Sequence, residues 1–213
     1  MIKVISFDCD GTLIDGNFNN YVWYEEIPKL YAEKYKMSFD EAYKIIKSEY
    51  DEYERKKDIR WGNPSYWIRK YKLNTTLEDV VKKEKIKIFD DVDILEQLKE
   101  RYILIVFSVC SKDYLDIKLI TGGLERYFEK TFSMVTDFKD ENSLSKTSNA
   151  FRKICKNLGV QPYEIVHIGD SVDWDYKPAK EANIKALLID RDNKYSNQDI
   201  NKIRSLRELK NIL

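Results

Sequence analysis

Residues 2–13 read Ile-Lys-Val-Ile-Ser-Phe-Asp-Cys-Asp-Gly-Thr-Leu, an apolar run that ends in two aspartates and a glycine. The apolar part, Ile2 to Phe7, is rich in β-branched residues and predicts a buried strand. Side chains alternate along an extended chain, so we expect Asp8 and Asp10 on one face, just before Gly11 lets the chain turn. Two such carboxylates repel each other unless a cation joins them. The alternative is that Asp10 and Gly11 simply form a turn.

The rest of the chain alternates between apolar segments and helical patterns. Four further segments predict buried strands: Tyr102–Phe107, Thr131–Val135, Ile165–Ile168 and Ala186–Ile189. Five segments carry apolar residues at helical spacing: Asp91–Glu100, Lys112–Ile120, Thr147–Leu158, Asp175–Ala182 and Asp199–Leu209. Gly122, Gly123 and Gly159 are suitable helix stops. This alternation predicts an α/β fold, a Rossmann-like doubly wound parallel sheet flanked by helices.

Residues 16–87 interrupt the alternation, because they contain no convincing strand. Their helical patterns lie near Asn20–Tyr35, Ser38–Lys56, Ser65–Tyr71 and Leu77–Lys83. Ser38 and Glu41 have the spacing of a capping box at the second of these helices. We therefore assign residues 1–15 and 88–213 to a core domain and residues 16–87 to an inserted all-helical subdomain.

A second acidic group, Gly169-Asp-Ser-Val-Asp-Trp-Asp175, follows the fourth predicted strand. The carboxyl ends of parallel strands lie at one edge of a sheet, so Asp170 is expected to face Asp8 across the switch point. An oxygen-rich site of this kind suits magnesium better than zinc. Asp173 and Asp175 also lie where the next helix begins, and for Asp173 we favour a helix-capping role.

Two more polar residues lie close to this edge of the predicted sheet. Ser108 ends the second strand, and Lys146 directly precedes the helix expected from Thr147. A hydroxyl donates a hydrogen bond to a phosphoryl oxygen, and an ammonium opposes the negative charge that develops during phosphoryl transfer. The alternatives are a turn serine and a solvated lysine. Chain order and strand-end placement favour a shared site for both residues.

These groups together resemble the haloacid dehalogenase superfamily of aspartyl-phosphate hydrolases. The family's first motif is similar to residues 8–13, its serine or threonine motif to Ser108, and its lysine motif to Lys146. Its last acidic motif is similar to Gly169-Asp170 with Asp175. The motifs follow the family's order and span most of the chain. The helical insertion resembles the family's cap, which closes over the site.

The resemblance implies a magnesium-dependent phosphatase that acts on a small phosphorylated metabolite. Asp8 would be the nucleophile that forms a phosphoaspartate, and Asp10 would protonate the leaving group and later activate water. Mg²⁺ would be held by the Asp8 carboxylate, the Asp10 main-chain carbonyl and the Asp170 carboxylate. Lys146 would orient Asp8, and Asp175 would support the metal shell or Lys146.

The sequence departs from the family pattern at two of these motifs. Family members often have a Pro-Asp-Pro-like stretch after the lysine, whereas residues 147–149 read Thr-Ser-Asn, and Lys139 lies nearby as a rival to Lys146. We assign the role to Lys146 because it directly precedes an amphipathic helix. Val-Cys-Ser replaces the commoner Asn-Gly after Ser108, so Ser111 is an alternative donor.

The same residues leave other functions open, both within this family and beyond it. Haloacid dehalogenases share the first aspartate but generally lack the second, so Asp10 favours phosphoryl chemistry. Phosphotransferases or mutases keep both aspartates and differ in how the cap excludes water, so they stay open as an alternative. From another class, the fold would serve as a catalytically silent binding module. Metal-dependent turnover distinguishes these possibilities.

Composition limits the partners and the compartment. The 37 basic and 37 acidic side chains balance, so no overall field favours nucleic acid or an anionic membrane. The longest apolar run, Tyr102–Phe107, is too short to span a bilayer. Cys9, Cys110 and Cys155 fit no metal or redox spacing, and the single His167 is expected to be a hydrogen-bonded core residue. We expect a cytoplasmic protein, and no pattern indicates an oligomeric state.

We expect the inserted helical subdomain to determine substrate specificity. It contains six aromatic residues that are more often cap core than binding surface, namely Tyr21, Trp23, Tyr24, Trp61, Tyr66 and Trp67. Arg60 and Asn63 flank the turn that contains Trp61, and we expect one of them to contact the substrate. The cap should open and close about hinges near residues 13–16 and 86–90.

Overall fold

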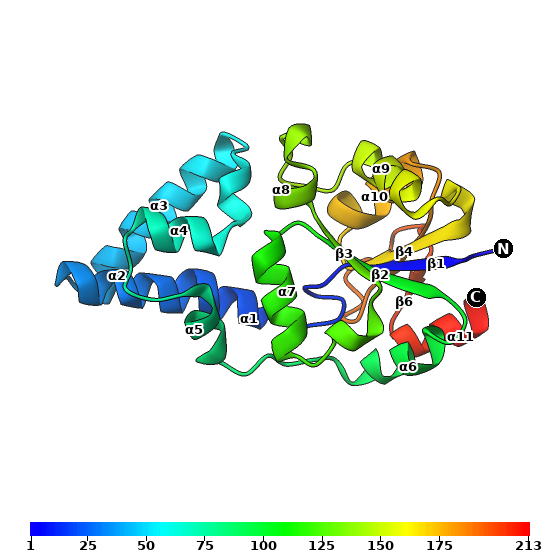
Figure 1. The fold of residues 1–213 in the computed structure, drawn as a ribbon, viewed down its shortest axis with the longest axis horizontal. Coiled ribbons are helices and arrows are strands. Elements are labelled where there is room, and N and C mark those ends of the chain that lie inside the picture. The colour runs from blue at the N-terminus through cyan, green and yellow to red at the C-terminus, as the bar shows by residue number, and fades with distance from the viewer.

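The computed structural model describes all residues 1–213 and contains a six-stranded sheet (Figure 1). Its spatial order is β3-β2-β1-β4-β5-β6, and every neighbouring pair is parallel. The strands are β1 Val4–Phe7, β2 Ile103–Ser108, β3 Lys130–Ser133, β4 Ile165–Gly169, β5 Lys185–Ile189 and β6 Lys202–Ile203. The strand order reverses at β1, which places a switch point at the centre of the sheet. The predicted doubly wound α/β fold is confirmed.

Helices cover both faces of the sheet, because each strand carries apolar side chains on both sides. One face packs on Leu95 and Leu98 of α6, Leu115 of α7 and Leu209 of α11. The other face packs on Phe151 of α9 and on α8 and α10. These helices are α6 Leu95–Leu98, α7 Lys112–Thr121, α8 Met134–Asp137, α9 Ser148–Leu158, α10 Lys177–Glu181 and α11 Leu209–Ile212.

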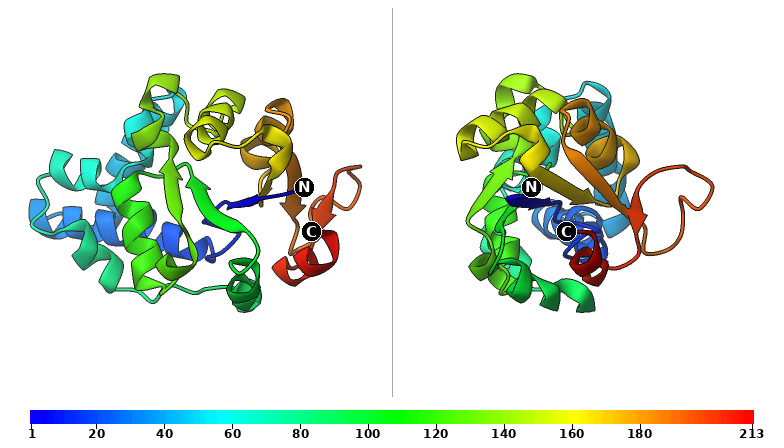
Figure 2. Two further views of the ribbon diagram at one scale, coloured as in Figure 1. Left: turned by 45° about the vertical axis from the view of Figure 1, so that its right-hand side comes forward. Right: turned by 90° about the vertical axis from the view of Figure 1, so that its right-hand side faces the viewer.

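The helical cap follows β1 and lies at the opposite end of the molecule from both termini (Figures 1 and 2). Its second long helix begins with the predicted capping box, in which Ser38 Oγ accepts from the Glu41 amide and Glu41 accepts from the Ser38 amide. A π-helical turn, Tyr21–Glu26, joins the first two cap helices. The cap helices are α1 Asn17–Asn20, α2 Ile27–Tyr35, α3 Phe39–Arg55, α4 Pro64–Lys70 and α5 Leu77–Lys82.

The two chain segments that join the cap to the sheet lie side by side. The Asp15 amide donates to the Lys87 carbonyl at 2.9 Å, and the Phe89 amide donates to the Leu13 carbonyl at 3.2 Å. Helix α5 also packs against α7, and buried cap residues such as Trp67 belong to the same apolar cluster as Leu115. The exact boundaries at residues 15 and 88, and hinge motion there, stay predictions.

Two predicted elements in the C-terminal half differ from the structure, one in where it ends and one in its type. The strand expected over Thr131–Val135 ends at Ser133, because Ser133 Oγ caps the next helix by accepting from the Thr136 amide at 3.0 Å. The helix expected over Asp199–Leu209 contains β6 instead, because its residues complete the edge of the sheet beside β5. Only the end of that segment is helical, in a 3₁₀ turn and α11. Figure 2 shows the loop before β6 extending away from the sheet.

Two other predicted helices have irregular first turns. The segment expected over Asp91–Glu100 begins as a 3₁₀ helix, Asp90–Ile94, and continues as the short α6. The segment expected from Asp175 begins earlier, as a π-helical turn over Val172–Tyr176 that leads into α10. None of the helices is both long and apolar enough to cross a membrane.

Candidate active site

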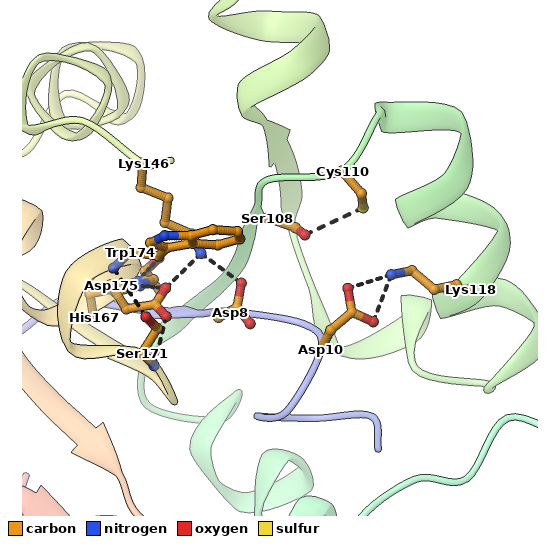
Figure 3. A network of polar contacts seen from close by, with 11 residues as sticks. Asp8, Asp10, Ser108, Cys110, Lys118, Lys146, His167, Ser171, Trp174 and Asp175 are labelled. Carbon is orange, nitrogen blue, oxygen red and sulfur yellow. Dashed lines mark hydrogen bonds and ion pairs between the residues drawn. The ribbon is translucent and has the colours of Figure 1, made fainter. Parts of the chain in front are cut away.

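The ends of three neighbouring strands surround one cavity of about 470 Å³. Asp8 follows β1, Ser108 ends β2 and Asp170 follows β4, and all three residues line it. Asp10, Lys146 and Asp175 line the same cavity. The sequence-predicted catalytic and metal residues therefore lie together at the carboxyl edge of the sheet, at its switch point. Figure 3 shows them from close by.

Lys146 lies between two buried carboxylates. Its Nζ donates to Asp8 Oδ1 at 2.6 Å and to Asp175 Oδ1 at 2.6 Å (Figure 3). The lysine is placed by the turn before α9, where Thr147 Oγ1 accepts from the Ala150 amide and so starts the helix one residue later. Lys146 is 3% exposed, so its charge acts in a region with little water to screen it.

Two glycines allow the strand ends to come this close. Gly11 has a φ of +81°, and a Cβ at that position would overlap the Asp170 carboxylate. A Cβ on Gly169 would overlap the carboxylate of Asp175. Both motifs therefore need glycine for close approach, and Gly11 needs it for backbone conformation as well.

His167 does not line the cavity but is hydrogen-bonded to Asp175, which does. The imidazole is buried, with Nδ1 2.9 Å from Ser6 Oγ and Nε2 3.0 Å from Asp175 Oδ1. Burial lowers the pKa of His167, so the ring is neutral, and only a protonated Nε2 can donate to a carboxylate. The expected hydrogen-bonded core histidine is confirmed, and its bond to Asp175 makes it a positioning group for the site.

The expected capping role of Asp173 was wrong. Ser171 caps this turn, because its Oγ accepts from the Trp174 amide at 3.2 Å. Asp175 accepts from the Ser171 amide at 3.1 Å through Oδ2, which completes its set of partners. Asp173 instead points to solvent and pairs with Lys177, one helical turn later. The turn begins at Val172, so Ser171 occupies the N-cap position and Asp173 lies inside the turn, where it cannot cap it.

Lys118 is a site residue that sequence reasoning missed. It lies in the middle of α7, is 0% exposed, and donates to both oxygens of Asp10 at 2.7 and 2.6 Å (Figure 3). A signal existed in the sequence, because Lys118 occupies the apolar face of its helix, four residues after Tyr114 and three after Leu115. A lysine at such a position needs a buried partner.

The charged residues Asp8, Asp10, Lys146, Asp170 and Asp175 form the floor of the cavity, which has more negative than positive charge. Burial raises the pKa of Asp8 well above its usual range, and Asp175, Asp170 and Asp10 add to the effect although Lys146 opposes it. Burial and the neighbouring Asp175 raise the pKa of Asp170 to about 6. For Asp175, Lys146 and His167 outweigh burial and hold the pKa below its usual range. A further cation would relieve this repulsion.

The donor set fits a hard divalent cation. Asp8, Asp170 and Asp175 each offer one carboxylate oxygen, and these atoms all lie within 4.8 Å of one another. No histidine or thiol belongs to the group, and oxygen donors suit magnesium. The oxygens of Asp175 already form hydrogen bonds with Lys146, His167 and the Ser171 amide. Asp8 and Asp170 are therefore the better carboxylate donors.

The rival residues named from the sequence lie elsewhere. Ser108 lines the cavity and its Oγ is 3.3 Å from Cys110 Sγ, whereas the buried Ser111 hydroxyl has no partner and does not line it. Lys139 begins a short 3₁₀ turn and does not line it either. The geometry therefore supports Ser108 and Lys146.

Arg60 and Asn63 do not line the cavity. The Arg60 Nε donates to Asp58 Oδ1 at 2.8 Å, and Asn63 caps α4 by accepting from the Tyr66 amide at 2.9 Å. Their contact with a substrate stays a prediction. The residues between them, Trp61 and Gly62, do line the cavity.

Comparison with known proteins agrees with this geometry. The family model described as haloacid dehalogenase-like hydrolase matches residues 2–183. The chain is 26% identical to the glyceraldehyde 3-phosphate phosphatase of Methanocaldococcus jannaschii, covering 98% of this chain and 97% of that protein. It is 24% identical to the enolase-phosphatase E1 of Aquifex aeolicus, covering 98% of this chain and 99% of that protein.

A solved structure is also similar over nearly the whole chain. The crystal structure of a HAD phosphatase from Thermococcus onnurineus superposes with a TM-score of 0.82 at 26% identity. The match covers 99% of this chain and 97% of that one. Sequence and structure thus agree on the relatives that this chain resembles.

Proposed function

The chain belongs to the haloacid dehalogenase-like hydrolases and is a phosphatase-type hydrolase, and from this premise we propose that it hydrolyses a small phosphate monoester through a phosphoaspartate on Asp8 with Mg²⁺ as cofactor. The observation that carries the proposal is the placement of Asp8 in the cavity, bonded to Lys146 and beside Asp170. The three unpaired cysteines fit a reducing compartment, so we place the enzyme in the cytoplasm.

In the first step, an oxygen of Asp8 attacks the phosphorus and the bond to the ester oxygen breaks. Asp10 gives a proton to the departing oxygen, which leaves as an alcohol. Lys146 keeps the Asp8 carboxylate oriented through its 2.6 Å bond and opposes the negative charge of the transferring group. Ser108 lines the cavity and donates a hydrogen bond to a phosphoryl oxygen.

In the second step, Asp10 takes a proton from water and the water oxygen attacks the phosphorus of the phosphoaspartate. The bond between phosphorus and Asp8 breaks, which releases inorganic phosphate and restores the carboxylate. In this state Lys118 holds both oxygens of Asp10. Each Asp10 oxygen keeps a further lone pair with which it can reach a leaving group or a water.

Magnesium would be held by the carboxylates of Asp8 and Asp170 and by the main-chain carbonyl of Asp10, and Asp175 would support this shell. The ion would supply positive charge that offsets the repulsion between the carboxylate nucleophile and the phosphoryl oxygens. The raised pKa values of Asp8 and Asp170 support this assignment, because burial and the neighbouring carboxylates outweigh the single charge of Lys146 at both groups.

The test is phosphate release from 4-nitrophenyl phosphate with and without Mg²⁺. We expect release only with the metal, and a loss of at least about a thousandfold in Asp8→Asn, which keeps the side-chain shape but removes the nucleophile. Asp173→Asn is the matched control, because Asp173 belongs to the second acidic group at the same edge of the sheet but points to solvent. Equal release by intact protein and Asp8→Asn would contradict the proposal.

A further inference from the structure

The roof of the catalytic cavity differs in chemistry from its floor. Aromatic side chains from the cap and the core line it, namely Trp23, Tyr24, Tyr50, Trp61, Tyr114 and Trp174. Trp23 and Trp61 are nearly parallel, with 12° between their ring planes and 6.3 Å between centroids. This arrangement offers a flat apolar wall to any group that enters beside it.

The roof has no positive charge. Lys146 is the only cationic side chain that lines the cavity, and both of its carboxylate partners belong to the floor. Arg60 is adjacent to Trp61 in sequence, but its guanidinium binds Asp58 and lies over the rings of Tyr53 and Tyr66. A carboxylate or second phosphate on the leaving group would find no counter-charge here. It would also be repelled by the acidic floor.

The roof does offer neutral hydrogen-bonding groups. The Tyr50 hydroxyl is buried and has no hydrogen-bond partner, although Tyr50 lines the cavity. Asn19 also lines it and accepts from the Tyr114 hydroxyl at 2.8 Å through Oδ1, which leaves its amide nitrogen for another acceptor. A buried hydroxyl without a partner is costly, so a ligand that supplies an acceptor would be favoured.

We propose that the substrate is a phosphate monoester whose alcohol part is uncharged, has a flat unsaturated ring that packs on Trp23 and Trp61, and carries a hydrogen-bonding group for Tyr50. Aryl-type and nucleoside-type monophosphates belong to this class. Phosphorylated carboxylic acids and bisphosphates do not. The inference rests on the proposed phosphatase function and narrows its substrate class.

Three benzyl phosphates and cyclohexylmethyl phosphate separate charge from shape, because the four leaving alcohols have similar acidity. We expect kcat/KM for 4-carbamoylbenzyl phosphate to exceed that for the isosteric 4-carboxybenzyl phosphate by at least tenfold. Benzyl phosphate should exceed cyclohexylmethyl phosphate by about threefold to tenfold, because only the former has a flat ring. Equal use of the two 4-substituted esters, or a preference for the acid, would overturn the inference while the phosphatase function stands.

Variants of the roof complete the test. Tyr50→Phe removes only the hydroxyl, and should raise KM for the 4-carbamoyl ester about threefold more than it raises KM for benzyl phosphate. Asn20→Lys places a cation at the cavity and should raise kcat/KM for the 4-carboxy ester at least tenfold. Asn74→Lys, an exposed position on the same cap, is the control and should change neither. If Asn20→Lys does not raise kcat/KM for the 4-carboxy ester, the lack of a positive charge in the roof is not what excludes acidic substrates.

One outcome concerns the proposed function itself. If the intact protein with Mg²⁺ releases phosphate from none of the four esters or from 4-nitrophenyl phosphate, the phosphatase proposal fails and the inference fails with it. If release occurs and depends on Asp8 but shows no preference for neutral esters, only the substrate class is wrong.

Discussion

Lys146 and Lys118 are the two buried lysines of this protein, and each binds one of the two aspartates that follow β1. Lys146 is shared between Asp8 and Asp175, which are both buried. Lys118 gives both of its bonds to Asp10, whose side chain is 20% exposed at the cavity. The proposed nucleophile Asp8 thus lies in a crowded acidic group with one lysine, whereas the proposed acid-base residue Asp10 has a lysine of its own.

This difference in lysine partners separates the proposed roles of Asp8 and Asp10, although they are only two residues apart in the sequence. The attraction between Asp175 and Lys146 outweighs the effect of burial on both groups. It raises the pKa of Lys146 and lowers the pKa of Asp175, so both side chains stay charged. Burial alone would lower the pKa of Lys118, but the negative charge of Asp10 has the larger effect and raises this pKa well above its usual range. A fixed lysine beside each aspartate would let the neighbouring carboxylates perform the two separate steps proposed for them.

The largest expected effect comes from Lys146→Met, which keeps the length of the side chain but removes its charge. We expect kcat to fall by about a hundredfold to a thousandfold for every ester, because charge stabilisation is lost for all of them. The metal-free protein should lose about 3–5 kcal/mol of unfolding free energy, because Asp8 and Asp175 stay buried without their cation. Steady-state kinetics and urea unfolding measure the two effects. A kcat within threefold of the wild type would contradict the assigned role.

Lys118→Met should have a smaller and more selective effect. Because Lys118 acts through Asp10, we expect kcat to fall about tenfold to a hundredfold for alkyl phosphates, whose leaving groups need protonation, and far less for 4-nitrophenyl phosphate. A purely structural role would lower both rates equally. Lys112→Met is the matched control on the same helix, because Lys112 binds the Thr131 carbonyl at 2.7 Å and pairs with Asp116 instead of Asp10.

A double-variant cycle sharpens the same point. Adding Lys118→Met to Asp10→Asn should lower kcat by no more than about twofold further, since the residue that Lys118 positions no longer acts as an acid or base. Adding Lys118→Met to Ser108→Ala should instead give a product of the two single effects. Full multiplication in the Asp10→Asn background would show that Lys118 acts independently of Asp10.

The smallest effect is expected for a charged pair on the surface of the cap. Arg60→Ala removes a pair with Asp58 whose arginine side chain is 54% exposed, and should change unfolding free energy by less than about 1 kcal/mol. Activity should stay within about twofold, because Arg60 does not line the cavity. A larger loss of kcat/KM, with stability unchanged, would support the contact between Arg60 and substrate that the sequence suggested.

The two lysines also show what sequence patterns reveal. Lys146 was found because it directly precedes a predicted helix in the family's motif order. Lys118 was missed because a lysine among many in a helical pattern is usually solvated, and only its place on the apolar face of α7 marks it as buried. The aromatic residues of the cap were read as core, and Trp67 is buried core, whereas Trp23 and Trp61 also line the cavity.

The sequence by itself determined the parallel α/β fold, the inserted helical cap and the strand-end positions of Asp8, Ser108 and Asp170. These features follow from local patterns of apolar spacing, turn residues and motif order, which the chain carries within short segments. Only the tertiary structure decided that β6 completes the sheet, that Lys118 serves Asp10, and that the cavity roof is neutral and aromatic. Those features depend on contacts between residues far apart in the chain, and no local pattern encodes which distant side chain will meet a buried charge.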